Sequence, residues 1–347
     1  MRIYITGIAG FLGSHLADHF IREGHDVRGN DTLLLGDKAN IPNVLWSTMD
    51  CRDFASHPEM LKDIDVLYHC AATAHEGLSV FSPSFITKNI YEASVAMFSA
   101  AIQAGVKRIV YCTSMARYGH GRNIKFPFDK HEGTVGKEAP PFIENKHIAA
   151  PVDPYGIAKV AAEDTLRALC NAHGVEYVIA VPHNIIGLRQ NYTDPFRNVA
   201  SIMINRMKQG KQPIIYGDGT QVRCFSPVVD VIDTLAKLAT EPGVSGEIFN
   251  IGPDDGEMTI NVLAESISNI LGFDLSPIYM AGRPLEVKHA ICSSEKIRNR
   301  FGYKRIQSVR DCLEEMCAAI EPKPFNYNLP IEIVTDKTPK TWSERLM

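Results

Sequence analysis

Apolar residues along the first half of the chain alternate between short continuous runs and longer stretches with helical spacing. The short runs have the length of β-strands and lie at residues 3–6, 26–29, 66–70, 108–112 and 176–181. The longer stretches predict helices, each followed closely by a glycine, at residues 11–23, 85–104 and 155–172. Because strands that alternate with helices form parallel sheets, this pattern predicts an α/β fold with a doubly wound parallel sheet.

The composition is that of an ordinary globular protein and limits the classes of function. The 347 residues carry a net charge of −4, so the chain lacks the basic excess typical of nucleic-acid-binding proteins, and we expect no nucleic acid partner. The eight cysteines and twelve histidines show no metal-ligand spacing, which predicts no metal site and reduced thiols in the cytoplasm. No run reaches 18 apolar residues and the chain starts directly with a predicted strand, so we expect neither a membrane span nor a signal peptide.

A glycine-rich turn follows the first predicted strand and opens the first predicted helix, with the sequence TGIAGFLG at residues 6–13. Gly7 permits a tight turn, Gly10 lets a pyrophosphate approach the backbone, and Gly13 lets the helix pack closely on the sheet. The N–H groups at the helix N-terminus then favour phosphate binding. Asp31 follows the second strand, where a carboxylate binds ribose hydroxyls and repels a 2′-phosphate, so we predict NAD as the cofactor rather than NADP.

A tyrosine and a lysine, Tyr155 and Lys159, lie four residues apart on one face of a predicted helix. An unperturbed tyrosine, with a pKa of about 10, is a weak base at neutral pH. A nearby ammonium group and a positive nicotinamide ring would both favour the phenolate, so the pair suits proton transfer beside a hydride acceptor. Thr113 and Ser114 close a predicted strand at the ligand-facing edge of the sheet and supply a candidate hydroxyl group.

Together these motifs resemble an extended short-chain dehydrogenase/reductase of the NAD-dependent epimerase/dehydratase group, whose members act on nucleotide-sugars. The matching segments include TGIAGFLG at 6–13, YCTSMARYG at 111–119 and YGIAK at 155–159. The resemblance implies a Rossmann-type sheet with a smaller C-terminal substrate-binding domain. It also implies that Ser114, Tyr155 and Lys159 are catalytic, with Thr113 as the alternative hydroxyl.

The resemblance extends to the binding residues for both ligands. The expected cofactor-binding residues are Gly7, Gly10, Phe11, Leu12, Gly13, Asp31, Asp50, Cys51, Ala71, Ala72, Asn89, Tyr155, Lys159 and Pro182. The expected substrate-binding residues are Ser114, Asn184, Arg223 and Arg283. Because a guanidinium group fits phosphate oxygens bidentately, the two arginines favour a nucleotide-diphosphate sugar as substrate, with UDP as the expected nucleotide.

The residues after Ser114 bear on the reaction. Sugar 4,6-dehydratases of this family carry an acidic pair directly after the hydroxyl residue, and here Met115 and Ala116 occupy those positions. The resemblance therefore favours 4-epimerisation of a UDP-hexose through a transient 4-keto intermediate. Alternatives are a nucleotide-sugar dehydrogenase, reductase or dehydratase of the same family, a reductase of small carbonyl compounds, and a non-catalytic NAD-binding sensor or assembly protein. Arg117 and His183 depart from the family pattern, and either they indicate an acidic sugar or they are structural.

Members of the family pair through two long helices of each subunit, which here match residues 85–104 and 154–172. The apolar residues that suggest such a surface are Met97, Phe98, Ile102, Leu166 and Leu169. We expect a homodimer, with burial in the chain's own core as the alternative role of these residues.

The predicted domain organisation follows from the same patterns. An NAD-binding domain is expected over residues 1–182, with an insertion at 120–153 that holds four prolines and forms a flap or a surface loop. A substrate-binding domain is expected mainly over 183–321, with 222–252 returning to the first domain. The tail at 322–347 is expected to wrap the surface or fray.

Overall fold

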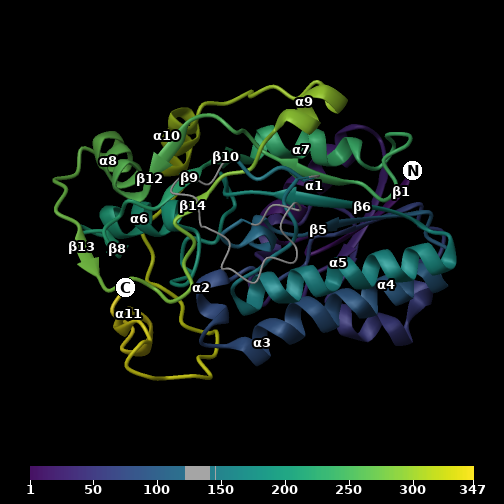
Figure 1. Cartoon of the computed structure of the whole chain (residues 1–347), viewed down its shortest axis with the longest axis horizontal. Coiled ribbons are helices and arrows are strands. Elements are labelled where there is room, and N and C mark those ends of the chain that lie inside the picture. Colours follow the sequence, from purple (N-terminus) through teal and green to yellow (C-terminus); the bar gives the residue numbers. More distant parts are fainter. Residues whose placement is uncertain (122–140, 145) are drawn as a thin grey trace.

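The computed structural model describes residues 1–121, 141–144 and 146–347, and its centre is a seven-stranded sheet (Figure 1). The sheet has the strand order β11-β6-β5-β4-β1-β2-β3, and all its neighbouring strands are parallel. Its strands are β1 (Arg2–Thr6), β2 (Asp26–Asn30), β3 (Leu45–Ser47), β4 (Val66–His69), β5 (Arg108–Cys112), β6 (Glu176–Pro182) and β11 (Ile248–Ile251). This is the order of a doubly wound Rossmann-type sheet, so the predicted fold class is confirmed.

Helices cover both faces of the sheet (Figure 1). The pair α1 (Phe11–Arg22) and α7 (Val228–Lys237) packs on one face, and the pair α4 (Ala93–Gln103) and α5 (Pro154–His173) packs on the other. Leu16 and Phe20 of α1 are fully buried because they lie four residues apart and share the face that meets the sheet. The sheet is therefore buried on both sides, which explains the continuous apolar runs of its strands.

The helix predicted at 85–104 is interrupted by a π-helical turn. α3 (Pro83–Thr87) leads into this turn at Lys88–Glu92, and α4 continues from it. A π turn holds more residues than an α turn and rotates the side chains that follow it. Apolar spacing did not reveal the interruption, because Ile86 before the turn and Ile90 within it are both buried at the four-residue spacing of an α-helix.

The second half of the chain builds a smaller region with its own apolar core. The helices that surround this core are α6 (Val199–Lys208), α8 (Ile260–Leu271) and α10 (Val309–Ala319). Its short strands are β7 (Ile185–Ile186), β8 (Ile214–Tyr216), β9 (Val222–Cys224), β10 (Ser226–Pro227), β12 (Glu257–Thr259), β13 (Ile278–Met280) and β14 (His289–Ala290). Within 222–252, β9 pairs with β12 and β14 in this smaller region. By contrast, β11 is an edge strand of the main sheet, and α7 packs beside α1 and β11. Helix α9 (Glu295–Phe301) also packs against α7 and β11.

The C-terminal tail packs against the body of the protein, which agrees with wrapping, the first of its two expected alternatives. Its helix α11 (Lys340–Ser343) carries Trp342, which is only 2% exposed. Trp342 and Leu329 form a small core with Phe81 and Phe196, from two other parts of the chain. The burial of one large aromatic ring anchors the polar tail against the body of the protein.

Most of the predicted insertion at 120–153 lies outside the described residues. Its C-terminal flank is held by backbone bonds: Phe142 N donates to Ile291 O at 2.9 Å, and Ala150 N donates to Arg117 O at 2.7 Å. In the parts of the chain that the structure describes, no helix is long and apolar enough to cross a membrane. The same parts contain no group of three or more potential metal ligands, and the eight cysteines are free thiols.

Candidate active site

One cavity of about 1230 Å³ lies at the carboxyl ends of the central strands and extends to the smaller region. All the residues predicted from the sequence to bind or act on ligands line it. They are Gly7, Gly10, Phe11, Leu12, Gly13, Asp31, Asp50, Cys51, Ala71, Ala72, Asn89, Thr113, Ser114, Tyr155, Lys159, Pro182, Asn184, Arg223 and Arg283. Residues that are far apart in sequence thus meet at the edge of the sheet where doubly wound folds bind ligands.

The glycine-rich turn is shaped to receive a pyrophosphate. Gly7 has a φ of +71°, which favours glycine. A Cβ atom at Gly13 would lie 2.2 Å from the Gly7 carbonyl oxygen, so α1 can pack this closely only without a side chain there. Gly10 caps the N-terminus of α1 without a side-chain hydrogen bond, which leaves the first turn open to the cavity. These residues fit the diphosphate of a dinucleotide.

Asp31 lies just beyond β2 and is tied to the glycine-rich turn. Its carboxylate accepts hydrogen bonds from Ala9 N at 3.0 Å and Leu33 N at 2.8 Å. Burial raises the pKa of this carboxyl, and the backbone donors oppose the rise. The neighbouring Asp50 is held by Arg52, whose side chain lowers the pKa of the Asp50 carboxyl. Both carboxyls stand at the predicted adenosine end of the cavity.

The predicted catalytic residues Tyr155 and Lys159 lie in the first two turns of α5. This helix starts at Asp153, whose side chain accepts a hydrogen bond from Gly156 N at 2.9 Å, and Pro154 follows as its first residue. Lys159 Nζ donates to the Cys112 carbonyl at the end of β5, at 2.8 Å. Burial lowers the pKa of Lys159 to about 8 and raises the pKa of Tyr155 to about 12. Burial thus favours the neutral phenol of Tyr155, and a further positive group beside it would favour the phenolate.

The two candidate hydroxyl groups after β5 have different surroundings. Thr113 Oγ1 donates to the buried Glu163 carboxylate at 2.6 Å. Ser114 Oγ accepts a weak bond from Ala116 N at 3.2 Å, and its contact with Tyr155 lowers the pKa of the phenol. The geometry therefore favours Ser114 over Thr113 as the partner of Tyr155.

Two further cofactor-side residues take part in local bonds. Ala71 N donates to Thr6 Oγ1 at 3.0 Å, which joins the ends of β4 and β1. Asn89, in the π-helical turn, donates to Phe85 O on its own helix at 2.8 Å. Its expected role in binding the cofactor stays a prediction.

The predicted substrate residues form a cluster at the other end of the cavity. Arg283 donates to the Glu286 carboxylate at 2.7 Å, and Arg223 lies 3.8 Å from the same carboxylate. The two guanidinium groups therefore converge on one anion, as binding of a diphosphate requires. The Asn184 amide donates to the Cys224 and Ala290 carbonyls, both at 3.1 Å, so it connects β9 and β14 to the end of β6.

Arg117 and His183 are structural, which is the second of the two expected alternatives, so they give no support for an acidic sugar. Arg117 forms an ion pair with Glu163, with Nε 3.0 Å from Oε1, and the two side chains are 4% and 0% exposed. His183 is buried, and its Nε2 bonds to the Pro253 carbonyl at 2.9 Å. Neither residue lines the cavity.

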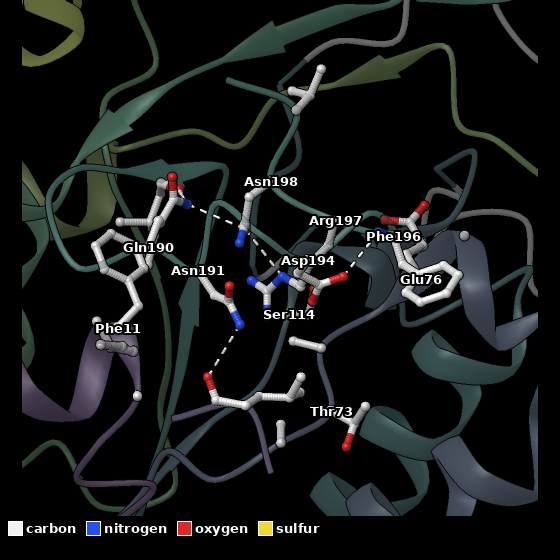
Figure 2. A pocket seen from close by; sticks show the side chains of 18 of the residues that line it. Phe11, Thr73, Glu76, Ser114, Gln190, Asn191, Asp194, Phe196, Arg197 and Asn198 are labelled. Atoms are coloured by element: carbon white, nitrogen blue, oxygen red, sulfur yellow. Dashed lines mark hydrogen bonds between the residues drawn. The ribbon is translucent and has the colours of Figure 1, made fainter. Parts of the chain in front are cut away.

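Several charged residues that the motifs did not reveal also line the cavity, among them Glu76, Asp153 and Arg197 (Figure 2 labels the first and the last). The signal for Asp153 was present in the sequence, as an aspartate followed by proline at a helix start. Glu76 precedes no recognisable motif, and Arg197 lies in a loop without helical or strand periodicity. Only the fold brings them to the cavity.

Comparison with known proteins agrees with this geometry. A profile described as the NAD dependent epimerase/dehydratase family matches residues 3–252. The chain belongs to this family. The predicted resemblance is therefore confirmed, and the protein is an enzyme of the extended short-chain dehydrogenase/reductase type that uses NAD.

Individual relatives have several activities. A putative UDP-glucose 4-epimerase of Methanocaldococcus jannaschii is 30% identical over 306 residues, which cover 87% of this chain and 92% of the relative. A UDP-N-acetyl-alpha-D-glucosaminuronate decarboxylase of Bacillus cytotoxicus is 30% identical over 289 residues, 78% of this chain and 80% of the relative. The crystal structure of a UDP-glucose 4-epimerase from Thermotoga maritima with UDP-glucose is 29% identical, with a TM-score of 0.80, and covers 92% of this chain and 98% of that chain.

Proposed function

We propose that the protein is a nucleotide-sugar 4-epimerase that acts on a UDP-hexose through a transient 4-keto intermediate. The observation that carries the proposal is the convergence of Ser114, Tyr155 and Lys159 at one end of a cavity whose other end holds two arginines. The positions of the dehydratase acids are occupied by Met115 and Ala116, which can neither donate nor accept a proton. The relatives at 29–30% identity include two named as UDP-glucose 4-epimerases, one of them putative.

The roles of the side chains follow from their positions. Tyr155 takes the proton of the sugar C4 hydroxyl, and Lys159 beside it stabilises the phenolate through its charge. Ser114 donates a hydrogen bond to the C4 oxygen as that oxygen changes between hydroxyl and carbonyl. Arg223 and Arg283 hold the diphosphate while the 4-keto sugar presents its other face. Bound NAD supplies the hydride acceptor and returns the hydride to C4.

The test is a product assay with purified protein, without added NAD, on UDP-glucose, UDP-N-acetylglucosamine and UDP-glucuronate. We expect the C4 epimer of at least one of them, and we expect Tyr155→Phe to lower the rate by about 10²–10⁴-fold. Formation of NADH only when NAD is added would identify a net dehydrogenase, and loss of water from the sugar would identify a dehydratase. Either result would overturn the proposal.

The cytoplasmic location stays a prediction.

We also propose a homodimer formed by α4 and α5. Met97, Phe98 and Leu166 are fully buried in the chain's own core and leave no surface for a partner. The dimer would instead use the outer face of α5, where Ile157 is 53% exposed. A monomeric mass in light scattering at micromolar concentration would contradict it.

A further inference from the structure

Arg197 stands beside the catalytic residues in the cavity. It lies in the loop between β7 and α6, and Figure 2 shows its side chain directed toward the same part of the pocket as Ser114. Its positive charge lowers the pKa of Tyr155 and also that of Lys159. Arg197 is therefore close to the position that the reacting sugar carbon must occupy.

The guanidinium group of Arg197 has no carboxylate partner within salt-bridge distance in the described part of the chain. Its Nε donates to the neutral side-chain oxygen of Asn198 at 3.1 Å. By contrast, Arg223 and Arg283 both lie beside the Glu286 carboxylate. A partly buried cation without a counter-charge is costly in a folded protein, and a ligand anion would remove that cost.

The backbone around Arg197 is fixed before any ligand binds. His75 Nε2 lies 2.6 Å from the Asp194 carboxylate, and the two side chains are 0% and 4% exposed. The second oxygen of Asp194 accepts a hydrogen bond from Phe196 N at 2.9 Å (Figure 2). The Phe196 ring is buried, with its centroid 5.3 Å from that of Trp342. The loop thus holds Arg197 in a preorganised position.

The other anions of the two ligands already have binding groups. The cofactor diphosphate fits the N-terminus of α1, and the substrate diphosphate fits Arg223 and Arg283. Arg197, next to Tyr155, is left for an anion on the sugar ring itself. Burial raises the pKa of the Glu76 carboxyl to about 7, so below that pH Glu76 is protonated and adds no negative charge beside Tyr155.

We propose that Arg197 binds a carboxylate on the sugar, so that the preferred substrate is a nucleotide-linked uronic acid. The proposal rests on the proposed function and deepens it. The planar guanidinium fork matches a carboxylate bidentately, and such a bond is among the stronger polar contacts in proteins. Arg197 is thereby a specificity-determining residue. It differs from Arg117, which forms a buried ion pair with Glu163.

The test compares the binding of UDP-glucuronate and UDP-glucose, by calorimetry, to the NAD-loaded wild-type protein and to Arg197→Gln. We expect the wild type to bind UDP-glucuronate more tightly, and we expect the substitution to reduce that preference by about 10–100-fold, as for loss of a charge-assisted pair. Arg197→Lys should recover part of it. Arg298→Gln is the control, because Arg298 does not line the cavity, pairs with Asp254 and should leave the preference unchanged.

Each other outcome overturns the inference in a recognisable way. Equal loss of affinity for both ligands would show a general role of Arg197, and a loss of bound NAD would show that it holds the cofactor. Tighter binding of UDP-glucose by the wild type would exclude a uronic acid preference while leaving the 4-epimerase proposal intact. The calorimetric test measures binding and the product assay measures turnover, so the two proposals can fail separately. If no epimer forms, the 4-epimerase proposal is wrong, whereas the binding preference for UDP-glucuronate is still measured.

Discussion

Among the residues that line the cavity, Glu76 has a carboxyl group whose surroundings shift its pKa strongly. Burial raises its pKa to about 7, and the nearby Asp153 carboxylate adds to the rise, whereas Arg223 and Arg283 oppose it. Glu76 therefore changes charge near neutral pH, within a cavity where the substrate diphosphate is expected. Its charge also raises the pKa of Tyr155, so the two groups are linked electrostatically.

The sign of the pH effect follows from the higher pKa of Glu76 in the folded state. Between its ordinary value of 4.5 and about 7, the folded protein holds a proton that the unfolded chain has lost. The resulting stabilisation is complete below pH 4.5 and disappears as the pH rises through 7. We expect Glu76→Gln, which stays neutral, to gain on the order of 1–3 kcal/mol over wild type between pH 5 and pH 8. Chemical denaturation without ligands would measure the free energy of unfolding of both proteins at each pH. The same pH dependence of this free energy in wild type and Glu76→Gln would contradict the prediction.

At the level of secondary-structure elements, the turn that follows β5 is fixed to α5 by a buried ion pair. Arg117, in the 3₁₀ turn Met115–Tyr118, places Nη2 3.1 Å from Glu163 Oε2 of α5. Thr113 also donates to this carboxylate. Because Ser114 lies on one of these elements and Tyr155 on the other, the pair fixes the distance between the two catalytic groups.

We expect Arg117→Leu to lower the free energy of unfolding by about 3–5 kcal/mol, because it leaves the Glu163 carboxylate buried without its main partner. Arg167 contacts the same carboxylate at 3.4 Å but is 28% exposed, so Arg167→Ala is the control, with an expected loss of about 0–1 kcal/mol. Urea denaturation would compare the two. Equal losses would contradict the assigned role, and so would a change in the preference between UDP-glucuronate and UDP-glucose in Arg117→Leu.

Across the whole molecule, the C-terminal tail completes the diphosphate end of the cavity. The Arg283 guanidinium lies 5.0 Å from the centroid of the Tyr216 ring. Tyr216 is in turn held by a hydrogen bond between its hydroxyl and Thr341 Oγ1 at 2.5 Å. Its ring also packs edge-to-face against the Trp342 ring, with the two ring centroids 6.1 Å apart. A Cβ atom at Gly77 would lie 3.0 Å from Arg283 Nη1, so the arginine is enclosed on that side as well.

We expect Trp342→Ala to destabilise the protein by about 3–5 kcal/mol, as for removal of a buried aromatic side chain. It should also raise KM for the nucleotide-sugar more than it lowers kcat, because Arg283 loses its support while Tyr155 is untouched. Trp342→Phe should restore most of the affinity. The control is Val334→Ala, at a tail residue that is 66% exposed. Steady-state kinetics would measure the effect, and an unchanged KM would show that the tail does not position Arg283.

The predictions from the sequence succeeded where the pattern is local. The glycine spacing at residues 7–13, the four-residue spacing of Tyr155 and Lys159, and the alternation of strands and helices depend only on neighbours in the chain. Local rules did not predict β3, which is a three-residue edge strand, or the π-helical turn at Lys88–Glu92. They also left open whether the polar tail would be anchored, since one buried tryptophan decides that.

Only the tertiary structure decided which charged side chains face the ligands. In the sequence, Arg117 and Arg197 are both single arginines in loops, and only Arg117 lies within a recognised motif, at 111–119. The fold places Arg117 against Glu163 and leaves Arg197 in the cavity beside the catalytic residues. The partner of a charged side chain comes from whichever distant segment packs against it, so no spacing within the chain distinguishes these two arginines.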